Sequence, residues 1–437
     1  MSNSKHARWL LAELPGLLKD KVLDQESAQK LEAHYKPLAL QKGSNPIFII
    51  TGILGALLIG AGIISIFAYN WDNFGRGLRA FLSVAPLLIA QGFYAYAYFK
   101  KKDSVAWIES TSGFLMLMLA SSIALISQTY NIAGSMEEFL WIWMLLSIPL
   151  MYLRNSTLAT MMFLAGISSW TFHVPESSSH IVRYWLLLAA AIPHLWMNIV
   201  HPDRRIRANL LGWTLGISLL FSMIRVPEWR VASGGIIAYA MVFGLLYLLG
   251  RKFYGKEEHP WQRPFQSIAI VGTYVMAMFF AFESIGFNLE WSEILAGKKY
   301  ASWASWTNIG IFMSALAGMG GMLIYHLRNK HWLNYFIVGF PVLVIAFMLL
   351  GGTDTVSPKV FLILFNAFLL AFGAYYLREG INKERLGLVN AGMFIMSSLF
   401  VMRFFDPDFS FLVKGVAFLL IGSAFFGVNI YLVKKKK

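Results

Sequence analysis

Seven polar residues beside three apolar stretches are the strongest candidates for a binding site in this sequence. They combine amide, carboxylate, guanidinium and phenol groups, and they are Asn70, Asp72, Arg76, Gln128, Tyr130, Arg403 and Asp406. Charges of both signs can bind a phosphate or sugar group, and arginine supplies paired donors. The alternative interpretation is interfacial anchoring with local ion pairs, such as an i, i+3 pair between Arg403 and Asp406.

The sequence lacks the common catalytic and metal-binding motifs. The sequence has no Walker A loop, HExxH, GxSxG or EF-hand pattern, and it has no cysteine. Disulfides, cysteine-bound zinc and iron–sulfur clusters are thereby excluded. We therefore expect no catalytic residues, no metal and no cofactor. One open alternative is a membrane-embedded transferase, because Asp72 follows the first apolar stretch as an acid does in the first outer loop of membrane glycosyltransferases.

The composition is typical of an integral membrane protein. Hydrophobic residues make up 57% of the chain and charged residues 14%, and the mean hydropathy is +0.58. Soluble domains carry about 25% charged residues. The net charge of +14 does not predict a nucleic-acid partner, because the basic residues lie mostly in short loops between apolar stretches. The expected partner is the lipid bilayer.

The sequence predicts an all-α fold with about fourteen transmembrane helices. The first, 47–69, has no charge and a length of about 34 Å, enough to cross the hydrocarbon layer. The others are 80–99, 112–130, 139–153, 157–173, 184–200, 208–224, 231–250, 265–283, 306–325, 332–350, 360–377, 386–402 and 415–433. The short pair 139–153 and 157–173 could instead form one re-entrant element.

Loop charge predicts the orientation. With the N-terminus inside, 27 of the 37 Lys and Arg residues fall in inner segments and 10 in outer ones. Positive charge favours the cytoplasmic side. We therefore expect a multi-pass protein of the bacterial cytoplasmic (inner) membrane with both termini in the cytoplasm, and the seven candidate residues on its outer face.

Residues 1–45 form a separate predicted domain ahead of the transmembrane domain, 46–437. Apolar residues recur at helical spacing from Trp9 to Leu18 and again from Ala28 to Tyr35, and Asp24 between them is the expected N-cap. This pattern predicts an amphipathic helical hairpin in the cytoplasm, a possible docking element for a cytoplasmic protein.

Polar residues deep inside the predicted spans are uncharged. No Asp, Glu, Lys or Arg lies near the centre of a span, which argues against proton coupling through buried carboxylates. His194 and Asn198 are four residues apart and share a helical face. We interpret them, with the other deep polar residues, as interhelical hydrogen-bonding groups rather than metal ligands.

The N-terminal pattern resembles a known family. Trp9, Leu17-Leu18, Ala28, Leu31 and Tyr35 precede Gly52-Ile-Leu-Gly-Ala-Leu-Leu-Ile-Gly60 and Asn70-Trp71-Asp72, and Ser127-Gln128-Thr-Tyr130-Asn131 and Arg403-Phe-Phe-Asp406 follow. These residues resemble bacterial polytopic membrane proteins with the domain of unknown function 2157. The resemblance implies a bacterial cytoplasmic membrane protein and brings no substrate or catalytic residue.

Three functions fit these observations. The leading hypothesis is a transporter or flippase-like protein that handles an amphipathic envelope molecule or a lipid-linked molecule at a polar outer-face site. The others are the membrane-embedded transferase and a non-enzymatic scaffold or sensor that docks a partner through residues 1–45.

Overall fold

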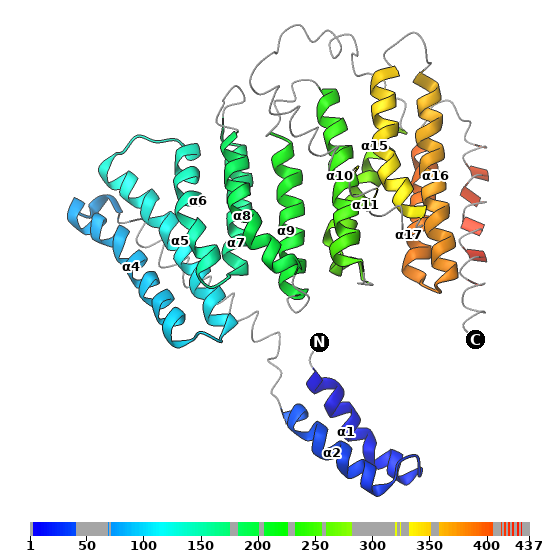
Figure 1. Ribbon diagram of the computed structural model, residues 1–437, viewed down its shortest axis with the longest axis horizontal. Coiled ribbons are helices and arrows are strands. Elements are labelled where there is room, and N and C mark those ends of the chain that lie inside the picture. The colour runs from blue at the N-terminus through cyan, green and yellow to red at the C-terminus, as the bar shows by residue number, and fades with distance from the viewer. Residues whose placement is uncertain are drawn as a thin grey trace. The chain divides into compact units, whose positions relative to one another are not determined.

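In its described part, the computed structural model contains helices, joined by turns and short irregular segments, and no strands. It describes residues 3–40, 69, 71–174, 182–200, 205–225, 232–255, 259–281, 332–350 and 358–404, with isolated positions between 320 and 430. The chain divides into a first unit, Met1–Arg79, and a second unit, Ala80–Lys437. Figure 1 shows the helices of both units.

The first unit contains the predicted hairpin. Its helices α1 (Asn3–Lys19) and α2 (Gln25–Leu40) pack against each other, with Leu14 and Ala28 buried between them. The Asp24 carboxylate accepts a hydrogen bond from the Ser27 amide at 3.3 Å, as an N-cap does. Hydrogen bonds from the Ser27 side chain and amide hold the pKa of the Asp24 carboxyl below its usual range.

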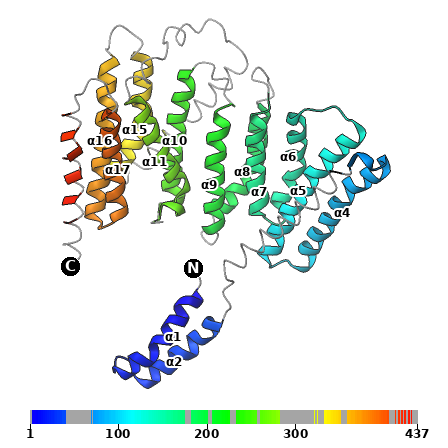
Figure 2. The same ribbon diagram turned by 180° about the vertical axis from the view of Figure 1, so that it is seen from behind.

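The second unit is a succession of apolar helices (Figures 1 and 2). They are α4 (Arg76–Lys100, which begins in the first unit), α5 (Val105–Tyr130), α6 (Met136–Leu153), α7 (Thr157–Thr171), α8 (Val182–Val200), α9 (Arg205–Met223), α10 (Ala232–Tyr254), α11 (Pro264–Phe280), α15 (Trp332–Leu350), α16 (Pro358–Asn382) and α17 (Leu386–Phe404). Two short 3₁₀ turns, η1 (Trp71–Asn73) and η4 (Pro260–Gln262), precede α4 and α11.

The predicted number of membrane spans is not supported. Six helices within the described ranges are long and apolar enough to cross a membrane by length and composition: Arg76–Lys100, Val105–Tyr130, Met136–Leu153, Ile206–Met223, Ile236–Tyr254 and Val360–Asn382. The predicted stretches 47–69 and 306–325 lie almost entirely outside the described residues, and 415–433 is described only at separate positions. The structure therefore supports a helical membrane protein with six candidate spans in its described part.

Helix α7 is too short to be among these six candidate spans. It has 15 residues, about 22 Å at the helical rise, which is shorter than a hydrocarbon layer of about 30 Å. Ten of its residues are buried, and it packs against α5, α6, α8 and α9. Its apolar side chains therefore contact protein, which hydropathy cannot distinguish from contact with lipid.

The buried side chains form two large clusters. One extends over α4–α9 and includes Met144, Phe163 and Trp170. The other extends over α9–α17 and is rich in phenylalanine, including Phe280 and Phe365. Helices α16 and α17 approach very closely: a Cβ added at Gly380 would lie 2.5 Å from the Val389 amide nitrogen, and one at Gly392 would lie 2.5 Å from that of Leu377. Small residues permit such close contact between membrane helices.

Candidate functional site

The seven residues predicted to form an outer-face site are only partly described. Asn70 and Asp406 lie outside the described residues. Asp72 lies in η1 and Arg403 in the last turn of α17, but their side chains are not among those described. Arg76 begins α4 with an exposed side chain. The predicted convergence of these residues stays a prediction.

Gln128 and Tyr130 lie at the end of α5, as expected. Both side chains are exposed. Asn131 closes the helix in the left-handed conformation, and its amide donates to the Gln128 carbonyl at 3.4 Å. The following Ile132 amide donates to the Ser127 carbonyl at 2.9 Å. The backbone of this end is thus capped, and the two exposed side chains are left to meet solvent, lipid headgroups or a ligand.

A buried polar network at the opposite end of the same helices is the most developed polar feature of the described chain. Its centre is the start of α7. The Glu109 carboxylate on α5 accepts hydrogen bonds from the Ser156 hydroxyl at 2.7 Å, the Thr157 amide at 2.9 Å and the Leu158 amide at 2.8 Å. A carboxylate at a helix N-terminus satisfies amides that have no partner within the helix and is favoured by the helix dipole.

Arg207 on α9 supplies the positive charge opposite the Glu109 carboxylate. Arg207 on α9 places Nη2 3.8 Å from the Glu109 carboxylate. Its Nη1 donates to the Asn155 carbonyl at 3.2 Å. Both side chains of the ion pair are mostly buried, with 24% and 19% exposed for Arg207 and Glu109. The turn before α7 is thus held by a carboxylate from one side and a guanidinium from another.

Two asparagines form a reciprocal amide pair beside this ion pair. Asn155 Nδ2 donates to Asn198 Oδ1 at 3.1 Å, and Asn198 Nδ2 donates to Asn155 Oδ1 at 2.6 Å. Asn155 has a φ of 55°, a conformation that asparagine tolerates better than most residues. The pair joins the α6–α7 turn to α8.

The fully buried His194 ring lies within this network. Its Nδ1 is 3.0 Å from the Thr160 hydroxyl, which itself donates to the Ser156 carbonyl at 2.9 Å. Its Nε2 is 3.4 Å from Asn198 Nδ2, an amide nitrogen that can only donate. These contacts hold the ring between Thr160 on α7 and Asn198 on its own helix. His194 therefore acts as a connecting hydrogen-bonding group, as expected from the sequence.

The sequence indicated the members of this network but not their meeting. His194 and Asn198 were recognisable as one helical face, and residues 154–156 as a tight turn. Glu109 and Arg207 are 98 positions apart in number and had no visible relation. Only the packing of α5 and α9 around the start of α7 brings their charges together.

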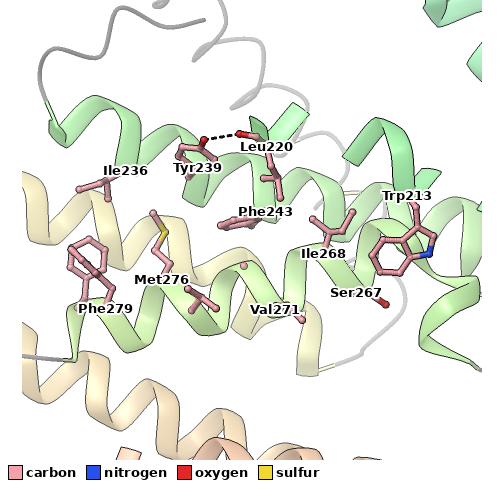
Figure 3. A pocket seen from close by; sticks show the side chains of 13 residues that line it. Trp213, Leu220, Ile236, Tyr239, Phe243, Ser267, Ile268, Val271, Met276 and Phe279 are labelled. Atoms are coloured by element: carbon pink, nitrogen blue, oxygen red, sulfur yellow. Dashed lines mark hydrogen bonds between the residues drawn. The ribbon is translucent and has the colours of Figure 1, made fainter. Parts of the chain in front are cut away.

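An apolar groove lies elsewhere in the second unit, between α9, α10 and α11 (Figure 3). Its volume is about 520 Å³, and its lining is almost wholly carbon. The residues are Trp213, Leu220, Ile236, Tyr239, Phe243, Ser267, Ile268, Val271, Gly272, Val275, Met276, Phe279 and Phe280. The Tyr239 hydroxyl donates to the Leu220 carbonyl at 2.7 Å, so one of the few polar groups of the lining is already bonded within the protein.

Potential metal ligands are not clustered in the described part of the chain. Within the described ranges, no three His, Asp or Glu side chains are grouped as metal ligands would be. The polar groups of the buried network bond mainly to one another, so the network resembles a structural contact between helices more than a reactive site.

Comparison with known proteins gives one match. Neither the curated proteins nor the solved structures gave a significant match to this chain. Residues 16–160, which include α2, α4, α5 and α6, match the family model described as "Predicted membrane protein (DUF2157)". That match confirms the resemblance seen in the sequence: residues 16–160 are similar to this family of predicted membrane proteins.

Proposed function

We propose that this membrane protein binds the apolar tail of an amphipathic envelope or lipid-linked molecule in the α9–α11 groove, as a transporter or flippase-like protein. The observation that carries the proposal is the groove itself. It is concave and apolar, and it lies on helices that meet lipid. A bilayer surrounds such a groove with acyl chains, so its natural occupant is a hydrocarbon tail.

The dimensions of the groove suit a lipid tail. Along α11 its lining extends from Ser267 to Phe280, about 20 Å at the helical rise, which is longer than the hydrocarbon thickness of one leaflet, about 15 Å. Val271 and Val275 are 59% and 58% exposed along its edge. Since apolar surface is not driven out of lipid, tail binding here depends on close van der Waals packing.

One end of the groove has the character of a membrane interface. Trp213 stacks on Trp261 with ring centroids 5.4 Å apart, and its indole nitrogen donates to the Trp261 carbonyl at 2.9 Å. Tryptophan favours the headgroup level. Loop charge assigns this end to the cytoplasm, since Arg251, Lys252 and Arg263 lie in the segments beside it. A bound amphiphile would place its headgroup near the two indoles.

The test is to fill the groove. Val271→Trp or Val275→Trp should reduce the lipid that co-purifies with the protein, as measured by native mass spectrometry. Val342→Trp on α15 is the matched control, because Val342 is 62% exposed and does not line the groove. Reconstituted vesicles with a fluorescent phospholipid would then separate translocation from binding. Unchanged lipid retention in both groove variants would refute the proposal.

The orientation and the outer-face site belong to the same proposal. We propose about fourteen spans, a location in the bacterial cytoplasmic membrane and both termini in the cytoplasm, on the support of the loop charges. Reporter fusions after Lys102, Arg207 and Lys437 should report the cytoplasm, and one after Asn131 the outside. A periplasmic signal after Lys437 would overturn the even number of spans.

A docking role for the hairpin is the second candidate. Trp9 and Val22 are 64% and 67% exposed on the first unit, and an exposed tryptophan is a common anchor for a protein partner. Affinity capture with the full chain and with Trp9→Ala should show a cytoplasmic protein retained only by the former. Equal capture by both would remove this role.

A further inference from the structure

We propose that the groove between α7 and α9 is a second binding site, for an uncharged lipid-soluble molecule with a flat ring and carbonyl oxygens, of the quinone type. This site is separate from the α9–α11 groove and does not depend on the function proposed above. Both grooves are lined in part by α9. Trp213 and Leu220 line the α9–α11 groove, and Ile217 and Phe221 line the α7–α9 groove.

The α7–α9 groove is more polar than its neighbour. Its volume is about 380 Å³, within the range of small-molecule pockets. Two helices line it, with Ala165, Ser168, Ser169 and Phe172 from α7 and Thr214, Ile217, Ser218 and Phe221 from α9. Half of these side chains carry a hydroxyl. An apolar site with a few hydroxyls fits a ligand that is mainly carbon and accepts a few hydrogen bonds.

Two buried serines, Ser168 and Ser218, line the inner side of the groove, and Ser222 lies behind them. The hydroxyls of Ser168 and Ser218 are 2.6 Å apart, and the Ser222 hydroxyl donates to Ser168 at 3.1 Å. Ser168 and Ser218 can both donate to the Leu164 carbonyl, at 2.9 and 3.1 Å. Because this carbonyl has two such donors, one hydroxyl can turn toward a ligand while the other stays in place.

A buried tyrosine behind the serines gives an independent sign of a ligand. Tyr184 on α8 is 1% exposed. Its hydroxyl faces Ser222 and Ser218 but has no hydrogen bond of normal geometry. A buried donor without an acceptor is unfavourable. A ligand carbonyl that draws a serine proton outward would free that serine's oxygen to accept from Tyr184. The hydrogen bonds would then all run in one direction, from Tyr184 to the ligand.

The residues that line the groove favour a ligand with an uncharged ring. No charged side chain lines it, and a charged ligand would lose its hydration without gaining a counter-ion. Phe172 and Phe221 are 38% and 54% exposed, so both rings are accessible from the lipid. Aromatic rings bind flat rings by stacking or edge-to-face contact. The nearby Arg225 is already engaged with Phe172, since its Nη2 is 3.4 Å from the Phe172 carbonyl oxygen.

The experiment measures binding of decylubiquinone to the purified full-length protein in detergent. Ile217→Trp should fill the groove and weaken binding by about tenfold or more, and Ser169→Ala should weaken it by a few-fold by removing an exposed hydroxyl. Ile192→Trp on α8 is the control, because Ile192 is 53% exposed and outside the groove. Val271→Trp, in the other groove, should leave quinone binding unchanged.

Tyr184→Phe distinguishes a ligand role from a structural one. Without quinone, this variant should melt no lower than the parent, since it loses a hydroxyl that has no partner. With quinone, it should gain less thermal stabilisation than the parent. Absence of decylubiquinone binding, equal binding by parent and Ile217→Trp, or loss only in Val271→Trp would each overturn the proposal. Equally tight binding of a decyl glycerol ether, which lacks the ring, would overturn the ring specificity.

Discussion

Helices α5–α9 and helices α10–α17 pack their interiors with different chemistry. The first group is joined at one end by Glu109, Arg207 and the Asn155–Asn198 pair. The second is centred on phenylalanines: the Phe365 ring lies 4.9 Å from Phe280, 5.7 Å from Phe347 and 6.2 Å from Phe340, centroid to centroid.

This difference has a consequence for how each region tolerates change. Hydrogen bonds are directional, so the network around α7 defines one turn, one helix start and one set of partners. Aromatic packing depends mainly on volume and allows several arrangements of similar energy. We expect the free energy of unfolding to depend mainly on the polar atoms of a substituted side chain in α5–α9, and mainly on the volume of a substituted side chain in α10–α17.

The largest expected effect is the loss of a ring from the phenylalanine cluster. Phe365→Ala should lower the free energy of unfolding by about 3–5 kcal/mol, because a fully buried ring leaves a cavity. Phe365→Leu, which keeps most of the volume, should cost less than about 1.5 kcal/mol. Thermal unfolding in detergent measures both. Equal losses would show that α10–α17 requires the ring itself rather than its volume.

Glu109→Gln should come next, with a loss of about 2–3 kcal/mol, although it hardly changes volume. The neutral amide leaves Arg207 without its counter-charge and weakens the cap of α7. Asp103→Asn is the control, since Asp103 is an exposed acid in the nearby loop. The same unfolding assay applies. A loss no larger than that of the control would remove the contrast between the two regions.

A smaller effect is expected for the asparagine pair. Asn155→Ala, Asn198→Ala and the double variant form a double-mutant cycle, and we expect a coupling energy of about 0.6–1.7 kcal/mol, the range for hydrogen bonds between membrane helices. Coupling near zero in the three unfolding curves would mean that the amide pair contributes little and that the ion pair alone holds the turn.

The smallest effect lies outside both regions, in the hairpin, and serves as a solvent-exposed reference. Since the pKa of Asp24 is lowered on folding, the cap stabilises α2 above the unfolded pKa of about 3.9. This stabilisation is lost as the pH falls through the folded value. In the Asp24→Asn variant, the stabilisation of α2 by residue 24 should not depend on pH. Hydrogen exchange at the Ser27 amide, compared between the two proteins from pH 6 to 2, measures it. Identical pH profiles would contradict the assignment.

Much of the architecture followed from one-dimensional patterns. Apolar runs identified the helices from α4 to α11 and from α15 to α17, with ends within seven residues of those observed, because a helix satisfies its own backbone and its apolar side chains need only be consecutive. Helical spacing and Asp24 likewise predicted the hairpin. The sequence also showed that His194 and Asn198 share one face of α8, since that depends on a single helix.

Only the tertiary structure decided which polar groups meet. Glu109 reaches the start of α7 because α5 packs beside it, and Ser168 meets Ser218 because α7 packs against α9. Hydropathy assigns the same value to a side chain facing lipid and to one facing another helix. For that reason the sequence did not show that ten of the fifteen residues of α7 are buried against neighbouring helices, and neither groove beside α9 could be recognised from it.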